Sequence, residues 1–227
     1  RMKWRGRRGS RNIEDRRRMT MRGGGSIGIV GMLVVLAVGY FFGIDVSPLL
    51  QGGGGAPVQT SSGEITPADE TAGKFVSVTL ADTEEVWAEI FPEQVGKPYD
   101  PVTLVLFKGV TQSPCGGASG ATGPFYCPAD ERIYLDTAFF TTMEQELGAR
   151  GDFAAAYVVA HEVAHHVQQE LGILGEANAL RRRVSPGESN AISVRIELQA
   201  DCYSGIWARA ANERFGTLER GDVDEAI

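Results

Sequence analysis

An uncharged segment near the N-terminus most constrains how this chain can fold. Residues 26–44 read SIGIVGMLVVLAVGYFFGI and contain no Asp, Glu, Lys or Arg. As a helix this segment would span about 28 Å, close to the roughly 30 Å hydrocarbon core of a bilayer. A buried helix of a soluble domain would normally carry a polar stripe, and this segment has none. The sequence therefore predicts a transmembrane signal anchor over residues 25–44.

Charge is divided unevenly on the two sides of this segment. Residues 1–22 carry ten Lys and Arg against Glu14 and Asp15, a net charge of +8. Because the whole chain has a net charge of −7, the remaining residues carry −15. The positive-inside rule then predicts a single-pass protein of the cell membrane, with a basic cytoplasmic arm at residues 1–24 and a periplasmic or extracellular C-terminal domain. A basic arm could also bind nucleic acid. Its place beside a spanning segment favours a role in setting the orientation of the chain in the membrane, so we expect no nucleic-acid partner.

Two further features of the uncharged segment leave alternatives open. Residues 37–39, AVG, form a small-x-small triplet of the kind found at a signal-peptide cleavage site. The apolar run continues past the triplet through the aromatic residues 40–42, which favours an uncleaved anchor. Gly39 and Gly43 form one G-x-x-x-G pair, which carries little weight because glycine is common in membrane helices. The oligomeric state stays open.

The rest of the chain divides into a linker and one domain. Residues 45–75 include QGGGG and TSSGEITPADETAG, lack apolar periodicity and predict a flexible linker. Residues 76–227 are predicted to form one domain, which begins with a helix that starts near Asp82. Strands are expected at 102–107 (VTLVLF) and 132–136 (RIYLD), and helices at about 137–147, 153–171, 176–184 and 189–215. Strands followed by helices indicate the α+β class, with a small β-sheet packed on a helical core.

The three cysteines fall into a pair and a single residue. Cys115 and Cys127 flank the glycine-rich sequence CGGASGATGPFYC. Outside the cytoplasm such a pair is expected to be oxidised, so we predict a Cys115–Cys127 disulfide. Metal-binding thiolates are the weaker alternative, because the chain has no C-x-x-C and no histidine near the pair. Cys202 has no evident partner, and we expect a buried free thiol there.

All three histidines of the chain fall within residues 160–168, AHEVAHHVQ. On a helix His161 and His165 lie about 40° apart around the axis and one turn apart along it, so both imidazoles can bind one ion. Glu162, about 100° from His161, can reach a metal-bound water without binding the metal. His166 points further away, and we expect it to pack or to meet solvent. This is the His-Glu-x-x-His pattern of zinc proteases.

The pattern alone can also arise by chance on a polar helix surface, so its surroundings matter. The sequence FAAAYVVA precedes it, and the residues between the histidines include Val163 and Ala164. Two histidines and a glutamate on a largely apolar helix need polar partners, and a metal ion would supply them.

A catalytic zinc usually takes three protein ligands and one water. With no histidine left, the third ligand is expected to be a carboxylate or a thiolate, and residues 197–201, ELQAD, offer it. Glu197 and Asp201 share a helix face, so Glu197 can complete the site while Asp201 accepts the second ring N–H of a ligand histidine. Apolar neighbours such as Ile192, Val194 and Leu198 indicate a mostly buried helix instead of a solvated polar face. Cys202 fits less well, because a thiolate ligand would leave Glu197 unexplained.

Three motifs, HEVAHHVQ, ELQADCYSGIWA and CGGASGATGPFYCPADERIYLD, resemble those of the bacterial putative neutral zinc metallopeptidase family. The resemblance covers essentially the whole chain, in order. It implies a gluzincin-like, zincin-type domain preceded by one membrane helix. It also implies one Zn2+ per chain, bound by His161, His165 and Glu197, with Glu162 as catalytic base and Asp201 supporting a ligand. Family members continue beyond the last residue given, so we expect this sequence to be a fragment.

These features together predict a membrane-anchored zinc endopeptidase that hydrolyses peptide bonds of a peptide or protein substrate outside the cytoplasm. Glu162 would assist the attack of a zinc-bound water on the substrate carbonyl. RIYLD is the expected edge strand for pairing with substrate, and Tyr203 and Arg195 are candidate electrophilic helpers. One alternative is a membrane-anchored binding or scaffold protein with a structural or vestigial zinc site, against which Glu162 argues. Another is a metal hydrolase that cleaves other amides.

Overall fold

The computed structural model describes residues 2–18, 64–119, 123–147, 151–216, 218–219 and 222. Residues 1–18 and 63–227 belong to one compact unit. The predicted anchor at residues 25–44 lies outside the described residues. Within the described ranges, no helix combines the length and the apolar character that crossing a membrane requires.

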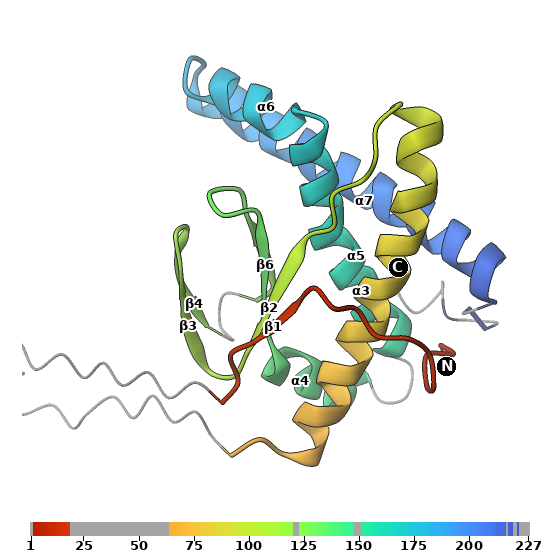
Figure 1. The fold of residues 1–227 in the computed structure, drawn as a ribbon. Helices are drawn as coiled ribbons and strands as arrows, with labels where there is room; N and C mark the ends of the chain where they lie inside the picture. Colours follow the sequence, from red (N-terminus) through yellow and green to blue (C-terminus); the bar gives the residue numbers. More distant parts are fainter. Residues whose placement is uncertain are drawn as a thin grey trace, which may run out of the picture. The chain divides into compact units, whose positions relative to one another are not determined.

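The helix α3 (Pro67–Gln94) is 28 residues long and packs against α5 (Gly151–Glu170) (Figure 1). Thr66 caps its N-terminus: the Thr66 hydroxyl accepts from the Asp69 backbone N–H, and the Asp69 carboxylate accepts from the Thr66 backbone N–H. Pro67 occupies the first turn, where no N–H is needed. The predicted boundary between linker and domain at residue 75 is therefore wrong. The sequence TPAD, taken as part of a linker, is a capping box.

Four strands form the main sheet in the order β1-β2-β6-β5. Their bounds are β1 (Ile13–Asp15), β2 (Thr103–Phe107), β6 (Arg132–Asp136) and β5 (Phe125–Cys127). The first three run parallel, and β5 is antiparallel to β6. The predicted strands at 102–107 and 132–136 are β2 and β6. RIYLD was expected at the edge of the sheet, but as β6 it lies between β2 and β5, so the edge strand on that side is β5.

Residues 2–18 belong to the folded unit, contrary to the predicted separate arm over residues 1–24. β1 pairs with β2, and Arg7 forms two hydrogen bonds with the Asp82 carboxylate of α3, at 2.6 and 2.5 Å. Arg17 is 7% exposed and donates to the Asp69 carbonyl at 2.8 Å. Figure 1 shows this red segment running along α3. Residues 2–18 are therefore part of the same folded unit as α3 and the main sheet.

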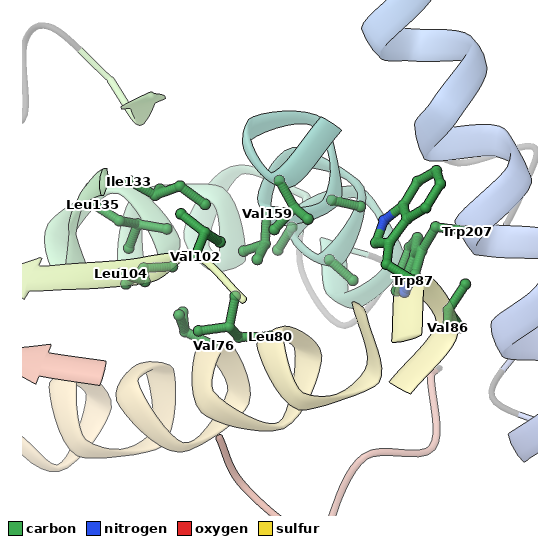
Figure 2. Close-up of a cluster of buried hydrophobic side chains, with 14 of the residues drawn as sticks. Val76, Leu80, Val86, Trp87, Val102, Leu104, Ile133, Leu135, Val159 and Trp207 are labelled. Carbon is green, nitrogen blue, oxygen red and sulfur yellow. The ribbon is translucent and has the colours of Figure 1, made fainter. Parts of the chain in front are cut away.

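Two buried layers cover the two faces of the sheet. On one face, Leu104, Ile133 and Leu135 meet Val76 and Leu80 of α3, as Figure 2 shows. On the other face, the cluster consists of Val105, Phe107, Ala118, Cys127 and Tyr134. The second cluster includes Ala118 of the separate hairpin formed by β3 (Val110–Ser113) and β4 (Gly116–Ser119). Within β6, Tyr134 belongs to this second cluster, while its neighbours Ile133 and Leu135 belong to the first.

Four helices follow the sheet in the chain, near the predicted ranges: α4 (Thr137–Leu147), α5 (Gly151–Glu170), α6 (Ile173–Arg181) and α7 (Pro186–Phe215). The α+β class is confirmed. The expectation that the last helix is mostly buried is wrong, because Val194 and Leu198 are 57% and 62% exposed. The helix α7 contributes few buried side chains, among them Trp207, which lies near Trp87 in Figure 2.

The cysteines divide as predicted, with one correction. Cys115 and Cys127 form a disulfide, which joins the start of the β4 region to the end of β5. Cys202 is free, as expected, but it is exposed instead of buried. The reason is the surface position of α7, whose outward face carries this residue.

Candidate metal centre

The helices α5 and α7 bring three of the predicted residues together. His161, His165 and Glu197 each offer one ligand atom, and these atoms lie within 4.8 Å of one another. The Oε2 atom of Glu197 is 3.1 Å from Nε2 of His161 and 3.5 Å from Nε2 of His165. In a tetrahedral zinc site with bonds of about 2.0–2.1 Å, neighbouring ligand atoms lie about 3.3–3.4 Å apart. The donor set and the two distances from Glu197 therefore fit one zinc ion.

Asp201 orients the first histidine, as predicted. Its Oδ1 atom lies 2.9 Å from Nδ1 of His161. An ionised carboxylate only accepts, so Nδ1 donates to Asp201, and Nε2 is the ring nitrogen that faces Glu197 and could bind a metal. The Asp201 backbone carbonyl is also held, because it accepts from the Tyr157 hydroxyl at 3.0 Å.

Gln168 orients the second histidine, and the sequence analysis missed it. Its Oε1 atom lies 2.9 Å from Nδ1 of His165, while its amide nitrogen donates to the Ile196 carbonyl at 2.8 Å. A backbone carbonyl cannot donate, so the amide nitrogen must face Ile196 and the oxygen must face His165. The proton of His165 is therefore on Nδ1, and Nε2 is free to bind a metal. Gln168 is fully buried, at 0% exposure.

Glu162 lies beside the three ligand residues without belonging to their group. Its side chain is buried, with 8% exposure, and its carboxylate accepts a hydrogen bond from the Tyr126 backbone N–H. Burial, together with the nearby charge of Glu197, raises the pKa of Glu162 to about 8. The structure thus places a titratable carboxyl group next to the candidate ligand group, on the side of strand β5.

His166 is buried and lies outside the ligand group. Its Nε2 atom is 2.8 Å from the Asp100 carbonyl, which only accepts, so Nε2 carries the proton. Its Nδ1 atom, 3.1 Å from the Tyr126 hydroxyl, then accepts the hydrogen bond. Of the two alternatives expected for His166, packing or meeting solvent, the structure shows packing.

A cavity of about 200 Å³ opens beside the ligand group. His165 and Glu197 line it on one side and Tyr126 on another. The two candidate helpers lie elsewhere: Arg195 lines a groove between α6 and α7, and the Tyr203 ring packs on Trp87 at 5.9 Å. Neither of these two candidates lines this cavity.

The arrangement agrees with a comparison against known families, because the family described as "Putative neutral zinc metallopeptidase" matches residues 2–227. The chain belongs to this zinc metallopeptidase family. Its relatives include YpfJ of Escherichia coli K12, an uncharacterized protein that is 44% identical over 100% of this chain and 81% of its own length. The uncharacterized protein Rv2575 of Mycobacterium tuberculosis is 41% identical over 62% of this chain and 46% of its own length. No solved structure matches this chain.

In this family member the sequence pattern located the three candidate ligands and Asp201, and it missed Gln168 and Tyr126. Gln168 stands three residues after His165 on α5, where a polar residue next to an apolar run could have drawn attention. Tyr126 had no such signal, because its place beside Glu162 depends on how β5 meets α5.

Proposed function

We propose that this family member is a zinc-dependent endopeptidase. One observation supports the proposal most directly: three ligand residues converge beside a cavity, while Glu162 lies next to them and is not one of them. A purely structural zinc site is usually closed by four protein ligands and has no use for a base at its side. The same observation argues against the alternative of a binding or scaffold protein.

Within this proposal, His161, His165 and Glu197 would hold the zinc ion. When bound, zinc lowers the pKa of a bound water and polarises a substrate carbonyl. Glu162 accepts a proton from the attacking water and delivers it to the leaving amine. Asp201 and Gln168 keep the two imidazole rings in the orientation that ligation requires.

Strand β5 is the proposed place for the substrate backbone. It is an edge strand of the main sheet, and the Tyr126 backbone N–H at its centre contacts Glu162. An extended peptide can add to such an edge by backbone hydrogen bonds. This arrangement would bring a peptide carbonyl close to Glu162 and to the cavity that His165 and Glu197 line.

The substitution Glu162→Gln tests the proposal. It removes the proton acceptor and keeps the shape of the side chain, so the variant should retain zinc and lose peptide hydrolysis. Zinc content is measured by metal analysis, and cleavage of casein and of a peptide library is measured with and without a chelator. Glu213→Gln, at an exposed position far along α7, is the matched control and should leave cleavage unchanged. Full activity of the Glu162 variant would exclude the mechanism.

We also propose that the protein associates with a membrane through residues 25–44. The absence of charge from residues 26–44 supports this association. Since residues 1–18 and 63–227 belong to one unit, we propose that both parts lie on the same side of that membrane. Which side this is, periplasmic or extracellular as first expected, stays a prediction.

A further inference from the structure

One face of α6 lines the cavity beside the candidate metal centre. Leu174, Asn178 and Arg181 follow each other at intervals of four and three residues, and all three contribute to the cavity wall. Such spacing places side chains on a single helical face. The position of Arg181 at the cavity is therefore set by the helix and does not depend on a flexible loop.

The Arg181 guanidinium is held in place by neutral groups. Its Nε atom donates to the Ser189 hydroxyl at 3.3 Å, and Nη1 donates to Oδ1 of Asn178 at 3.4 Å. Among the described residues, no carboxylate forms an ion pair with Arg181, whereas Arg209 and Arg214 on α7 both have one. Arginine carries five N–H donors arranged to fit a carboxylate, so donors are left for a ligand.

The charges around the cavity favour an anionic group. Among the described residues that line the cavity, Glu197 is the only acidic one, and it belongs to the candidate ligand group. If the charge of Glu197 is neutralised by a bound metal ion, Arg181 is the remaining charged side chain of the described cavity wall. A carboxylate that enters the cavity would therefore meet a positive charge without a competing acid.

The helix α7 gives the distance between this arginine and the reacting centre. Ser189, which accepts from Arg181, precedes Glu197 by eight residues on α7. Eight helical residues rise about 12 Å. An extended peptide covers about 3.3–3.6 Å per residue, so a group bound at Arg181 lies about two to four residues from the scissile bond once the reach of the side chains is included.

We propose that Arg181 binds a carboxylate of the substrate, either an acidic side chain or a free C-terminus, about two to four residues from the scissile bond. This inference rests on the proposed peptidase function, because it assigns a specificity to the same cavity. A free C-terminus only one residue from the scissile bond lies too close, so release of single C-terminal residues is not expected.

Binding to an inactive protein tests the inference without relying on turnover. The probes are fluorescein-labelled decapeptides with an otherwise neutral sequence, in which a single Glu occupies a different position in each peptide. Each has a matched peptide with Gln in place of Glu. Every peptide is made with a free and with an amidated C-terminus. Anisotropy titrations use the zinc-loaded Glu162→Gln chain. We expect the best carboxylate peptide to bind roughly three- to tenfold more tightly than its neutral match. Adding Arg181→Gln should abolish this preference, and adding Arg182→Gln, at a neighbouring exposed arginine outside the cavity wall, should preserve it.

The two sources of the carboxylate separate within the same series. A preference that follows the Glu position assigns an acidic side chain, and one that disappears on amidation assigns the free C-terminus. Equal binding of all carboxylate and neutral peptides, or an equal effect of the Arg182 variant, overturns the inference. If the wild-type protein cleaves the peptides without any such preference, the peptidase function stands and this specificity fails. If carboxylate binding depends on Arg181 but no peptide is cleaved, the peptidase function fails and the binding site stands.

Discussion

Gln168 connects the ring of His165 to the backbone of α7. It accepts from His165 Nδ1 through one end of its amide and donates to the Ile196 carbonyl through the other. Ile196 directly precedes Glu197 in the sequence. One buried side chain thus fixes both the tautomer of a ligand on α5 and the position of the neighbouring ligand helix. Two of the three ligands depend on its geometry.

Replacing Gln168 by alanine should weaken zinc binding about 10- to 100-fold, the usual effect of removing a hydrogen-bond partner of a metal-bound histidine. The reason is that His165 loses its fixed orientation and α7 loses a contact beside Glu197. Zinc affinity is measured by competition with a chromophoric chelator. The zinc affinity of Gln168→Glu should lie between those of the wild type and Gln168→Ala, because this substitution keeps the acceptor for His165 and loses the donor to Ile196.

The adjacent Gln169 supplies the control for this prediction. Its side-chain amide donates to Glu131 at 3.2 Å on the protein surface, and among the described residues it forms no hydrogen bond with His165 or with α7. Gln169→Ala should therefore bind zinc like the wild type. If both substitutions lowered the affinity equally, a general loss of α5 stability would explain the result, and the specific role of Gln168 would be refuted.

Asp69 is a second buried group whose charge the fold uses. Burial alone would raise the pKa of Asp69, but hydrogen bonds from Lys108, Thr66 and Thr137 outweigh burial and hold that pKa well below its ordinary value. The Lys108 ammonium lies 2.6 Å from the carboxylate, which is 2% exposed. Because the folded-state pKa is depressed, the stabilisation is present above the unfolded pKa, about 4, and is lost as the pH falls below it.

Asp69→Asn should therefore lower the free energy of unfolding by about 1–3 kcal/mol at pH 7. The difference between the wild type and the variant should shrink as the pH is lowered from 5 to 3, because the Asp69 carboxyl of the unfolded wild-type chain then takes up a proton while that of the folded protein stays ionised. Urea denaturation at a series of pH values measures both effects. A difference that stays constant over this range would show that the charge of Asp69 contributes nothing and that only its shape matters.

Local sequence patterns were sufficient for the two helices that carry the ligands. The spacing of His161 and His165 places both rings on one face of any helix, and Glu197 and Asp201 likewise share a face. That these two faces lie together could be predicted from one further fact, which is that a catalytic zinc usually takes three protein ligands. The two predicted strands also succeeded from local patterns, because VTLVLF is a continuous run rich in apolar, strand-favouring residues and RIYLD alternates.

The predictions that were wrong concern parts of the fold that depend on contacts between residues distant in the sequence. β1 and β5 are three residues long, too short to show a period, and each forms only because β2 or β6 is available beside it. RIYLD was placed at the sheet edge because nothing in the sequence reveals β5. The arginines of the N-terminus were predicted to set the orientation of the chain in a membrane, although Arg7 and Arg17 have buried partners on α3.

The last prediction concerns these N-terminal residues and the side of the membrane on which they lie. Because β1 pairs with β2 and Arg17 contacts α3, a cysteine at Lys3 and one at Arg183, both exposed positions, should share one compartment. In a Cys202→Ser background, a membrane-impermeant maleimide applied to intact spheroplasts should label both cysteines or neither. Lysis before labelling is the control and should make both reactive. If only one were labelled in intact spheroplasts, the N-terminal residues and the metal-binding domain would lie on opposite sides, and the pairing of β1 with β2 could not exist in the membrane-bound protein.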